Sequence, residues 1–96
     1  MEEIKLELNE KKHGAFRLMV EEKEIGEMVI SIKDNDLTVY HTEVKPEGEG
    51  KGYAKKLLDA MVAYVRENNL KVIPLCPYVL AQFKRHTDQY ADIWKR

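Results

Sequence analysis

The sequence predicts a small α+β domain, in which a mostly antiparallel sheet of about five strands is combined with two helices. Apolar and polar residues alternate in four segments of the first half of the chain, as they do in half-buried strands. An apolar pattern with helical spacing follows, and a short apolar segment comes directly after it. Strand, helix and strand in this order form a right-handed βαβ unit, so we expect the fourth and fifth strands to be parallel.

Polar turns separate the first three strands. Alternation predicts the first strand at residues 4–8, and a polar turn at 9–14 separates it from a second strand at 15–20. The third strand covers about 25–32. It ends at residues 33–36, where short polar side chains can bond to their own backbone and favour a turn.

The fourth strand runs from about Leu37 to Val44, and neither of its faces is plainly polar. We therefore place it near the centre of the sheet. Because side chains alternate along a strand, two faces are expected. One holds Leu37, Val39 and His41, and the other holds Thr38, Tyr40, Thr42 and Val44.

The second half of the chain contains the predicted helices. The first covers about 52–68, and its apolar positions recur at helical spacing at Ala54, Leu57, Leu58, Met61, Val62 and Val65. A fifth strand at 71–75 should end or leave its neighbour at Pro74, because proline donates no ladder hydrogen bond. Proline favours the first helical position, so Cys76-Pro77 opens a helix to about Arg85. The tail, 86–96, should dock on the body through Tyr90, Ile93 and Trp94.

Length and composition narrow the class of protein. The 96 residues are enough for a single domain, 1–96, and are 44% hydrophobic and 34% charged. The net charge of -1 does not favour nucleic acid or a membrane surface as partner. One cysteine excludes an internal disulfide, which fits the cytoplasm. The N-terminus lacks an apolar signal-peptide region, and we find neither a membrane-length apolar run nor a metal-ligand spacing.

The most informative segment lies between the fourth strand and the first helix. It contains three glycines, Gly48, Gly50 and Gly52. Glycine lets a backbone approach a ligand closely, and a helix start presents free N–H groups. Together they favour a phosphate or pyrophosphate site, although an ordinary strand-to-helix turn has the same composition.

Two common phosphate-binding patterns are excluded. The nucleoside triphosphate pattern G-x-x-x-x-G-K-[ST] fails because Tyr53 follows Gly52. The dinucleotide pattern G-x-G-x-x-G would need glycine at Tyr53 or at Lys55. A different class of phosphorylated ligand is therefore expected.

The loop resembles the acetyl-coenzyme A site of the GCN5-related N-acetyltransferases, whose motif [QR]-x-x-G-x-[GA] follows a central strand. Here the matching segment is Glu49-Gly50-Lys51-Gly52-Tyr53-Ala54, and Glu49 departs from the motif. Lys51, Lys55 and Lys56 can compensate for its charge. A subgroup of similar length carries His-Thr-x-Val before the loop and Cys-x-Tyr after the next strand. The chain has His41-Thr42-Glu43-Val44 and Cys76-Pro77-Tyr78.

This resemblance implies a minimal form of the family fold that binds acetyl-coenzyme A or coenzyme A. The backbone near Val44 would orient the pantetheine arm, and the acetyl group would lie between the fourth and fifth strands. The activity implied is acetyl transfer to an unknown amine. The cofactor-binding residues implied are Val44, Glu49, Gly50, Lys51, Gly52, Tyr53, Ala54 and Lys55.

Three side chains are candidates for catalysis, and each has a structural alternative. Cys76 lies at a helix start, which favours the thiolate. It can accept the acetyl group or protonate the leaving thiolate of coenzyme A. The structural alternative is that Cys76 is a small buried apolar residue. His41 is a candidate base, or a buried structural histidine. Tyr78 is a general acid or a pantetheine contact, or it packs in the core. Thr42 is expected to pack or to hydrogen bond.

Two rival functions are compatible with the same sequence. One is a non-catalytic module that binds coenzyme A or its esters, which Glu49 favours. The other is an interaction domain without a small ligand. The protein is expected to be a monomer or a weak homodimer, the latter if a strand edge or the helix face around Tyr64 is uncovered.

Overall fold

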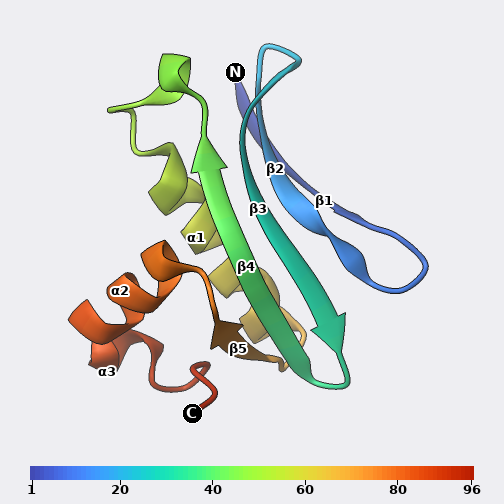
Figure 1. Ribbon diagram of the computed structural model, residues 1–96, viewed down its shortest axis with the longest axis vertical. Helices are drawn as coiled ribbons and strands as arrows, with labels where there is room; N and C mark the ends of the chain where they lie inside the picture. The colour runs from blue at the N-terminus through green and yellow to red at the C-terminus, as the bar shows by residue number, and fades with distance from the viewer.

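The five strands form one sheet with the order β1-β2-β3-β4-β5 (Figure 1). The computed structural model describes all residues from Met1 to Arg96. Its strands are β1 Glu2–Leu8, β2 His13–Val20, β3 Lys23–Lys33, β4 Asp36–Val44 and β5 Lys71–Pro74. Neighbours are antiparallel except β4 and β5, which are parallel. The predicted antiparallel sheet with a βαβ unit is therefore confirmed.

The helices comprise the two predicted ones and two short additions. They are the 3-10 turn η1 Pro46–Gly48, α1 Tyr53–Glu67, α2 Pro77–Arg85 and α3 Thr87–Tyr90. Helix α3 was not expected from the sequence, and it forms in the segment that was expected only to dock on the body. No helix is both long enough and apolar enough to cross a membrane.

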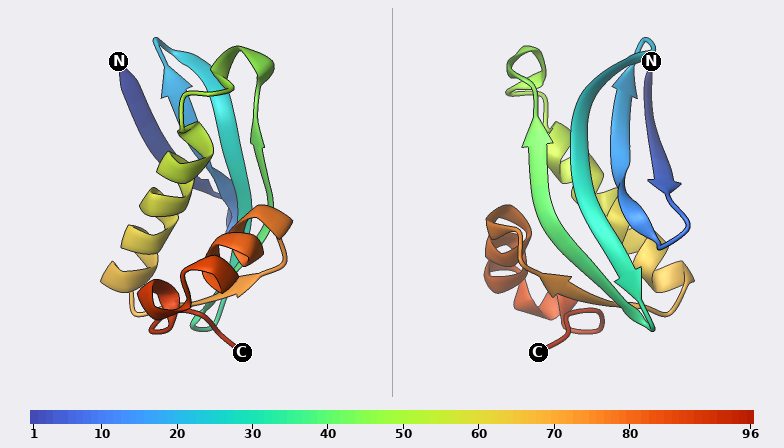
Figure 2. Two further views of the ribbon diagram at one scale, coloured as in Figure 1. Left: turned by 90° about the vertical axis from the view of Figure 1, so that its left-hand side faces the viewer. Right: turned by 45° about the vertical axis from the view of Figure 1, so that its right-hand side comes forward.

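Helix α1 covers one face of the sheet, and the opposite face carries no helix over β1, β2 and β3 (Figure 2). The buried positions of α1 are Tyr53, Leu57, Leu58, Met61, Val62 and Val65. Their spacing of three and four residues makes a single apolar stripe. The stripe packs against β2, β3 and β4 and forms the core with them.

A β-bulge in β4 changes the faces expected from simple alternation. Val29 pairs with His41 but Ile30 pairs with Val39, so Tyr40 is an extra residue without an opposite partner. A bulge shifts every later side chain to the other face. Thr42, which is opposite the buried Met28, therefore joins Leu37 and Val39 on the core face, whereas His41 lies on the outer face. The expected grouping of His41 with Leu37 and Val39 is wrong.

Strand β5 is short because it ends at Pro74. It pairs with β4 only from Asp36 to Val39, and the chain then leaves the sheet toward α2. The C-terminal tail closes the other side of β5. Val72 donates to Ile93 O at 2.7 Å, and Lys95 donates to Val72 O at 2.9 Å. The expected docking of the tail is thereby confirmed.

Gly48 is buried and is required for close packing. An added Cβ would contact Ile25 and would lie 2.9 Å from Tyr53 Cδ2. Gly48→Ala should therefore lower the free energy of unfolding by about 1–3 kcal/mol, the usual cost of overpacking. Chemical denaturation of both proteins measures this difference. A variant as stable as the wild type would contradict the close approach.

Candidate functional site

The loop between η1 and α1 is open to solvent at two glycines. Gly50 has φ of 79° and Gly52 has φ of 75°, a region that other residues adopt only under strain. A Cβ at either position would meet no atom within 4 Å. Unlike Gly48, these two glycines are thus required by the backbone conformation and leave open space beside it.

The backbone N–H groups from Gly50 to Lys55 have no hydrogen-bond acceptor in the protein. The first helical N–H with a backbone acceptor outside α1 is that of Lys56, which donates to Gly52 O at 3.1 Å. Free N–H groups at a helix start carry partial positive charge, and the helix dipole adds to it. This run of donors fits a phosphate or pyrophosphate.

Only one of the three expected lysines is free to support that anion. Lys55 pairs with Asp59 at 2.8 Å, and Lys56 pairs with Glu2 on β1. Lys51 and Glu49 are both exposed, and neither of them makes an ion pair. The loop therefore offers Lys51 as its one uncommitted cation.

Tyr53 contributes to the site through its backbone alone. Its side chain is buried in the core, beside Gly48. Burial, followed by the negative charge of Glu2, raises the pKa of Tyr53. The phenol thus stays neutral, and its ring fixes the first turn of α1 against the sheet.

The C-terminal half of β4 has an open edge next to the loop. Lys45 donates from its N–H to Ile25 O at 2.8 Å, so the alternating backbone groups of Thr42 and Val44 face away from β3. Pairing with β5 ends at Val39. The edge from Thr42 to Val44 can therefore accept an extended ligand in strand-like hydrogen bonds.

Cys76 lies where this edge meets the start of α2. It is 2% exposed, and its N–H donates to Val39 O at 2.9 Å. Its Sγ is 3.3 Å from Thr42 Oγ1, and either the thiol or the hydroxyl can donate. The Thr42 hydroxyl is therefore the polar group that positions the Cys76 sulfur.

The structure does not bring His41 to Cys76. His41 is exposed on the outer face of β4, with Nε2 3.8 Å from Glu43 Oε1. Thr42, to which the sequence analysis gave only packing or a hydrogen bond, takes the place beside the thiol. The bulge at Tyr40 causes this exchange, and residue alternation gives no signal for it.

Tyr78 is half-buried and is the second residue of α2. Burial raises the pKa of Tyr78, and the charges of Lys55 and Asp59 on α1 also act on it. The phenol therefore remains protonated at neutral pH. A protonated phenol in this position can donate a proton or a hydrogen bond.

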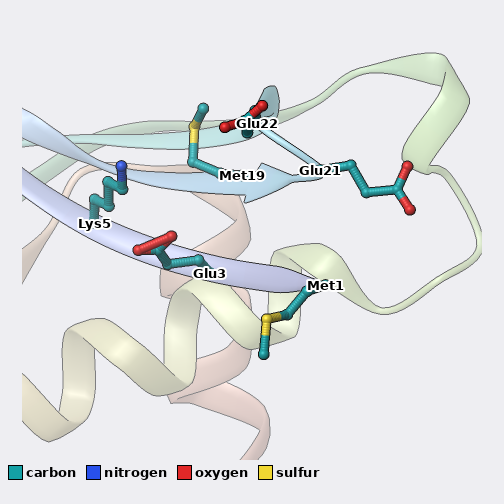
Figure 3. Close-up of a pocket in the computed structure, with 6 residues that line it drawn as sticks. All are labelled: Met1, Glu3, Lys5, Met19, Glu21 and Glu22. Atoms are coloured by element: carbon teal, nitrogen blue, oxygen red, sulfur yellow. The ribbon is translucent and has the colours of Figure 1, made fainter.

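The surface depression drawn in Figure 3 lies apart from these groups. It measures about 430 Å³ and is lined by Met1, Glu3, Lys5, Met19, Glu21 and Glu22. Glu3 and Lys5 lie on β1, Met1 precedes it, Met19 lies on β2, and the two remaining residues form the turn between β2 and β3. The lining residues include neither the glycine loop nor Cys76. The candidate site is therefore identified by its free hydrogen-bonding groups and not by this depression.

Comparison with known proteins identifies the family. Residues 15–93 match the model described as GCN5-related N-acetyl-transferase. The chain therefore belongs to the GCN5-related N-acetyltransferase family. A search of curated proteins found no match.

Solved structures share the fold. A GCN5-like protein from Staphylococcus aureus is 32% identical with a TM-score of 0.65, and the match covers 97% of this chain and 87% of that one. The ribosomal-protein-alanine N-acetyltransferase of Brucella melitensis is 20% identical with a TM-score of 0.63, over 84% of this chain. PaiA N-acetyltransferase of Thermoplasma acidophilum, in complex with coenzyme A, is 16% identical with a TM-score of 0.59, over 78%.

The chain is much shorter than some of these proteins. It spans 64% of the Brucella enzyme and 48% of the Thermoplasma enzyme. The outer face of the sheet, which carries His41, has no helix over β1, β2 and β3 (Figure 2).

Proposed function

We propose that this protein transfers the acetyl group of acetyl-coenzyme A to an amine. The observation that carries the proposal is the run of free N–H groups from Gly50 to Lys55 beside two open glycines. These groups would bind the pyrophosphate, with Lys51 supplying a positive charge. The complex of the Thermoplasma relative with coenzyme A supports the choice of ligand.

The open edge of β4 supports the path of the pantetheine arm. Its amides can hydrogen bond to the backbone at Thr42 and Val44, as an added strand would. An arm that leaves the glycine loop along this edge brings the thioester to the start of α2. Cys76 is the nucleophilic side chain at that point.

Cys76 would carry the acetyl group between donor and acceptor. Its thiolate attacks the thioester carbonyl carbon, a new carbon–sulfur bond forms, and the bond to the sulfur of coenzyme A breaks. The leaving thiolate takes a proton, for which the Tyr78 phenol is the candidate donor. The amine then attacks the acetyl carbon, the bond between that carbon and the Cys76 sulfur breaks, and the Cys76 thiolate is released. The proton that the amine nitrogen loses returns to the Tyr78 phenolate, which restores the phenol. A thiol in this role must stay reduced, which fits the cytoplasmic location we propose.

A non-catalytic coenzyme A-binding module is the second candidate. Glu49 favours it, because an exposed carboxylate beside the glycine loop opposes a pyrophosphate. The bare outer face of the sheet also favours it, because nothing there builds a cleft for an acceptor. Such a module would bind coenzyme A but would form no acetyl adduct.

Coenzyme A should raise the melting temperature of the protein. A ligand that binds only the native state stabilises it by about 2.7 kcal/mol at a hundredfold excess over the dissociation constant. Thermal melts with increasing coenzyme A measure this. Lys51→Ala should weaken the response. Lys33→Ala should not, because Lys33 lies beside Asp36 at the start of β4, whereas the glycine loop follows the end of β4. A melting temperature that coenzyme A leaves unchanged would contradict both candidate functions.

A further inference from the structure

The two edges of the sheet are treated differently. The tail covers the edge of β5 through the hydrogen bonds between Val72, Ile93 and Lys95. The edge at β1 has no such cover, and the strand forms the outer border of the sheet in both figures (Figures 1 and 2). An uncovered edge strand presents unpaired backbone groups to any strand that fits.

The unpaired groups of β1 belong to its even-numbered residues. Asn9 donates from its N–H to His13 O, and Met1 O accepts from Glu21 N–H, so the odd-numbered residues face β2. Ile4, Leu6 and Leu8 therefore present N–H and C=O groups outward. The pairing of β1 with β2 has no bulge, and β1 contains no proline that would block a further strand.

The side chains of β1 divide cleanly between its two faces. Ile4, Leu6 and Leu8 are half-buried against the rim of the core. Lys5 and Glu7 lie on the other face with Glu3, and Figure 3 shows Glu3 and Lys5 side by side there. An added strand with the same division would extend both the apolar and the charged surface.

We propose that the occupant of this edge is a second copy of the chain, paired antiparallel through β1 about a twofold axis at Leu6. Ile4 of each copy then lies opposite Leu8 of the other, and the two Leu6 residues face each other. On the charged face, Lys5 of each copy lies opposite Glu7 of the other. Opposite charges and apolar pairs at facing positions both stabilise a sheet.

Charge and hydrophobicity select this register among the symmetric ones. An axis at Lys5 would place the two lysines opposite each other and Glu3 opposite Glu7, which are repulsive pairs. An axis at Ile4 would place Glu2 opposite Leu6. Only the axis at Leu6 keeps the three apolar residues of each strand in contact and also places Lys5 of each copy opposite Glu7 of the other.

The proposed dimer is independent of the acetyl-transfer proposal. Strand β1 lies at the opposite edge of the sheet from β4 and β5, between which the candidate site lies. The glycine loop and Cys76 therefore lie outside the proposed interface in each copy. A failure of either proposal leaves the other intact.

Sedimentation velocity over a range of protein concentrations tests the dimer. Wild-type protein should show a concentration-dependent dimer. Lys5→Glu alone and Glu7→Lys alone should each remain monomeric, because like charges then face each other. An equal mixture of these two variants should dimerise again, and so should the double variant.

Glu3→Lys is the matched control on the same face of β1. It should leave the dimer in place, because Glu3 lies opposite Asn9 when the axis is at Leu6. Loss of the dimer in this variant would move the axis to Ile4, where Glu3 faces Lys5. A wild-type protein that stays monomeric at every concentration overturns the proposal.

Glu7→Lys also removes the 2.7 Å ion pair with Arg17, so its effect on the dimer has a second possible cause within the monomer. Cysteine cross-linking gives a readout that leaves this ion pair in place. Leu6→Cys should form a disulfide-linked dimer under mild oxidation, since hydrogen-bonded partners have Cα atoms about 5.5 Å apart. Ile4→Cys should not, because its symmetry mate is displaced along the strand. Equal cross-linking of both variants, or of neither, contradicts the register.

Discussion

Protein incubated with acetyl-coenzyme A should gain one acetyl group, and the Cys76→Ser variant should gain none. Cys76 is the only cysteine, and its sulfur lies at the end of the open edge of β4. Serine keeps the size of the side chain but is a far weaker nucleophile at neutral pH. Turnover with an amine should fall by several orders of magnitude, as when other enzymes lose a nucleophile. Intact-mass spectrometry measures the adduct.

The binding of coenzyme A provides the control for this experiment. The N–H groups from Gly50 to Lys55 lie on a different segment from Cys76, so Cys76→Ser should keep the melting shift with coenzyme A. Unchanged turnover in Cys76→Ser would mean that the amine attacks the thioester directly. Intact binding without an adduct or turnover in the wild-type protein would favour the non-catalytic module.

The contact between Thr42 and Cys76 explains why this site was only partly predictable. The glycines, the lysine-rich loop and the cysteine at a helix start are visible in the sequence because each has a local pattern. The partner of Cys76 is not visible in the sequence, because it depends on the bulge at Tyr40, and no residue type in this strand predicts a bulge. Because of this one extra residue in β4, the side chain beside the thiol is that of Thr42 and not that of His41.

The glycines show the same limit in the loop itself. Composition alone does not distinguish Gly48 from Gly50 and Gly52. The structure separates them physically, because Gly48 packs against Ile25 and Tyr53, whereas the other two have positive φ and open space. A local pattern predicts that a turn is rich in glycine, but contacts between distant segments determine what each glycine does.

The strands and helices were predictable because their patterns of burial are local. The apolar stripe of α1 and the alternation in β1 both describe a single element. The edges of the sheet depend instead on where the termini lie, and the hydrogen bonds from the tail to Val72 have no local signature. This is why the sequence left monomer and weak homodimer open, whereas the fold identifies β1 as the uncovered edge.

Phe83→Ala should be the most destabilising single truncation in the C-terminal part of the chain. Phe83 is fully buried, with its ring stacked on Tyr90 at 4.8 Å and tilted against Trp94 at 5.6 Å. It therefore connects α2 to both α3 and the tail that covers β5. Removing a buried phenylalanine costs about 3–5 kcal/mol, a large share of the roughly 5–15 kcal/mol that stabilises a domain. Urea unfolding of both proteins measures the loss.

Leu75→Ala is the matched control, because Leu75 is another large apolar residue of the same region but is 60% exposed. Its truncation should change the free energy of unfolding by no more than about 0.5 kcal/mol. Equal losses in the two variants would contradict the burial of Phe83. Because the tail pairs with Val72, Phe83→Ala should also increase hydrogen exchange at the Val72 and Lys95 amides, whereas Leu75→Ala should leave both protected.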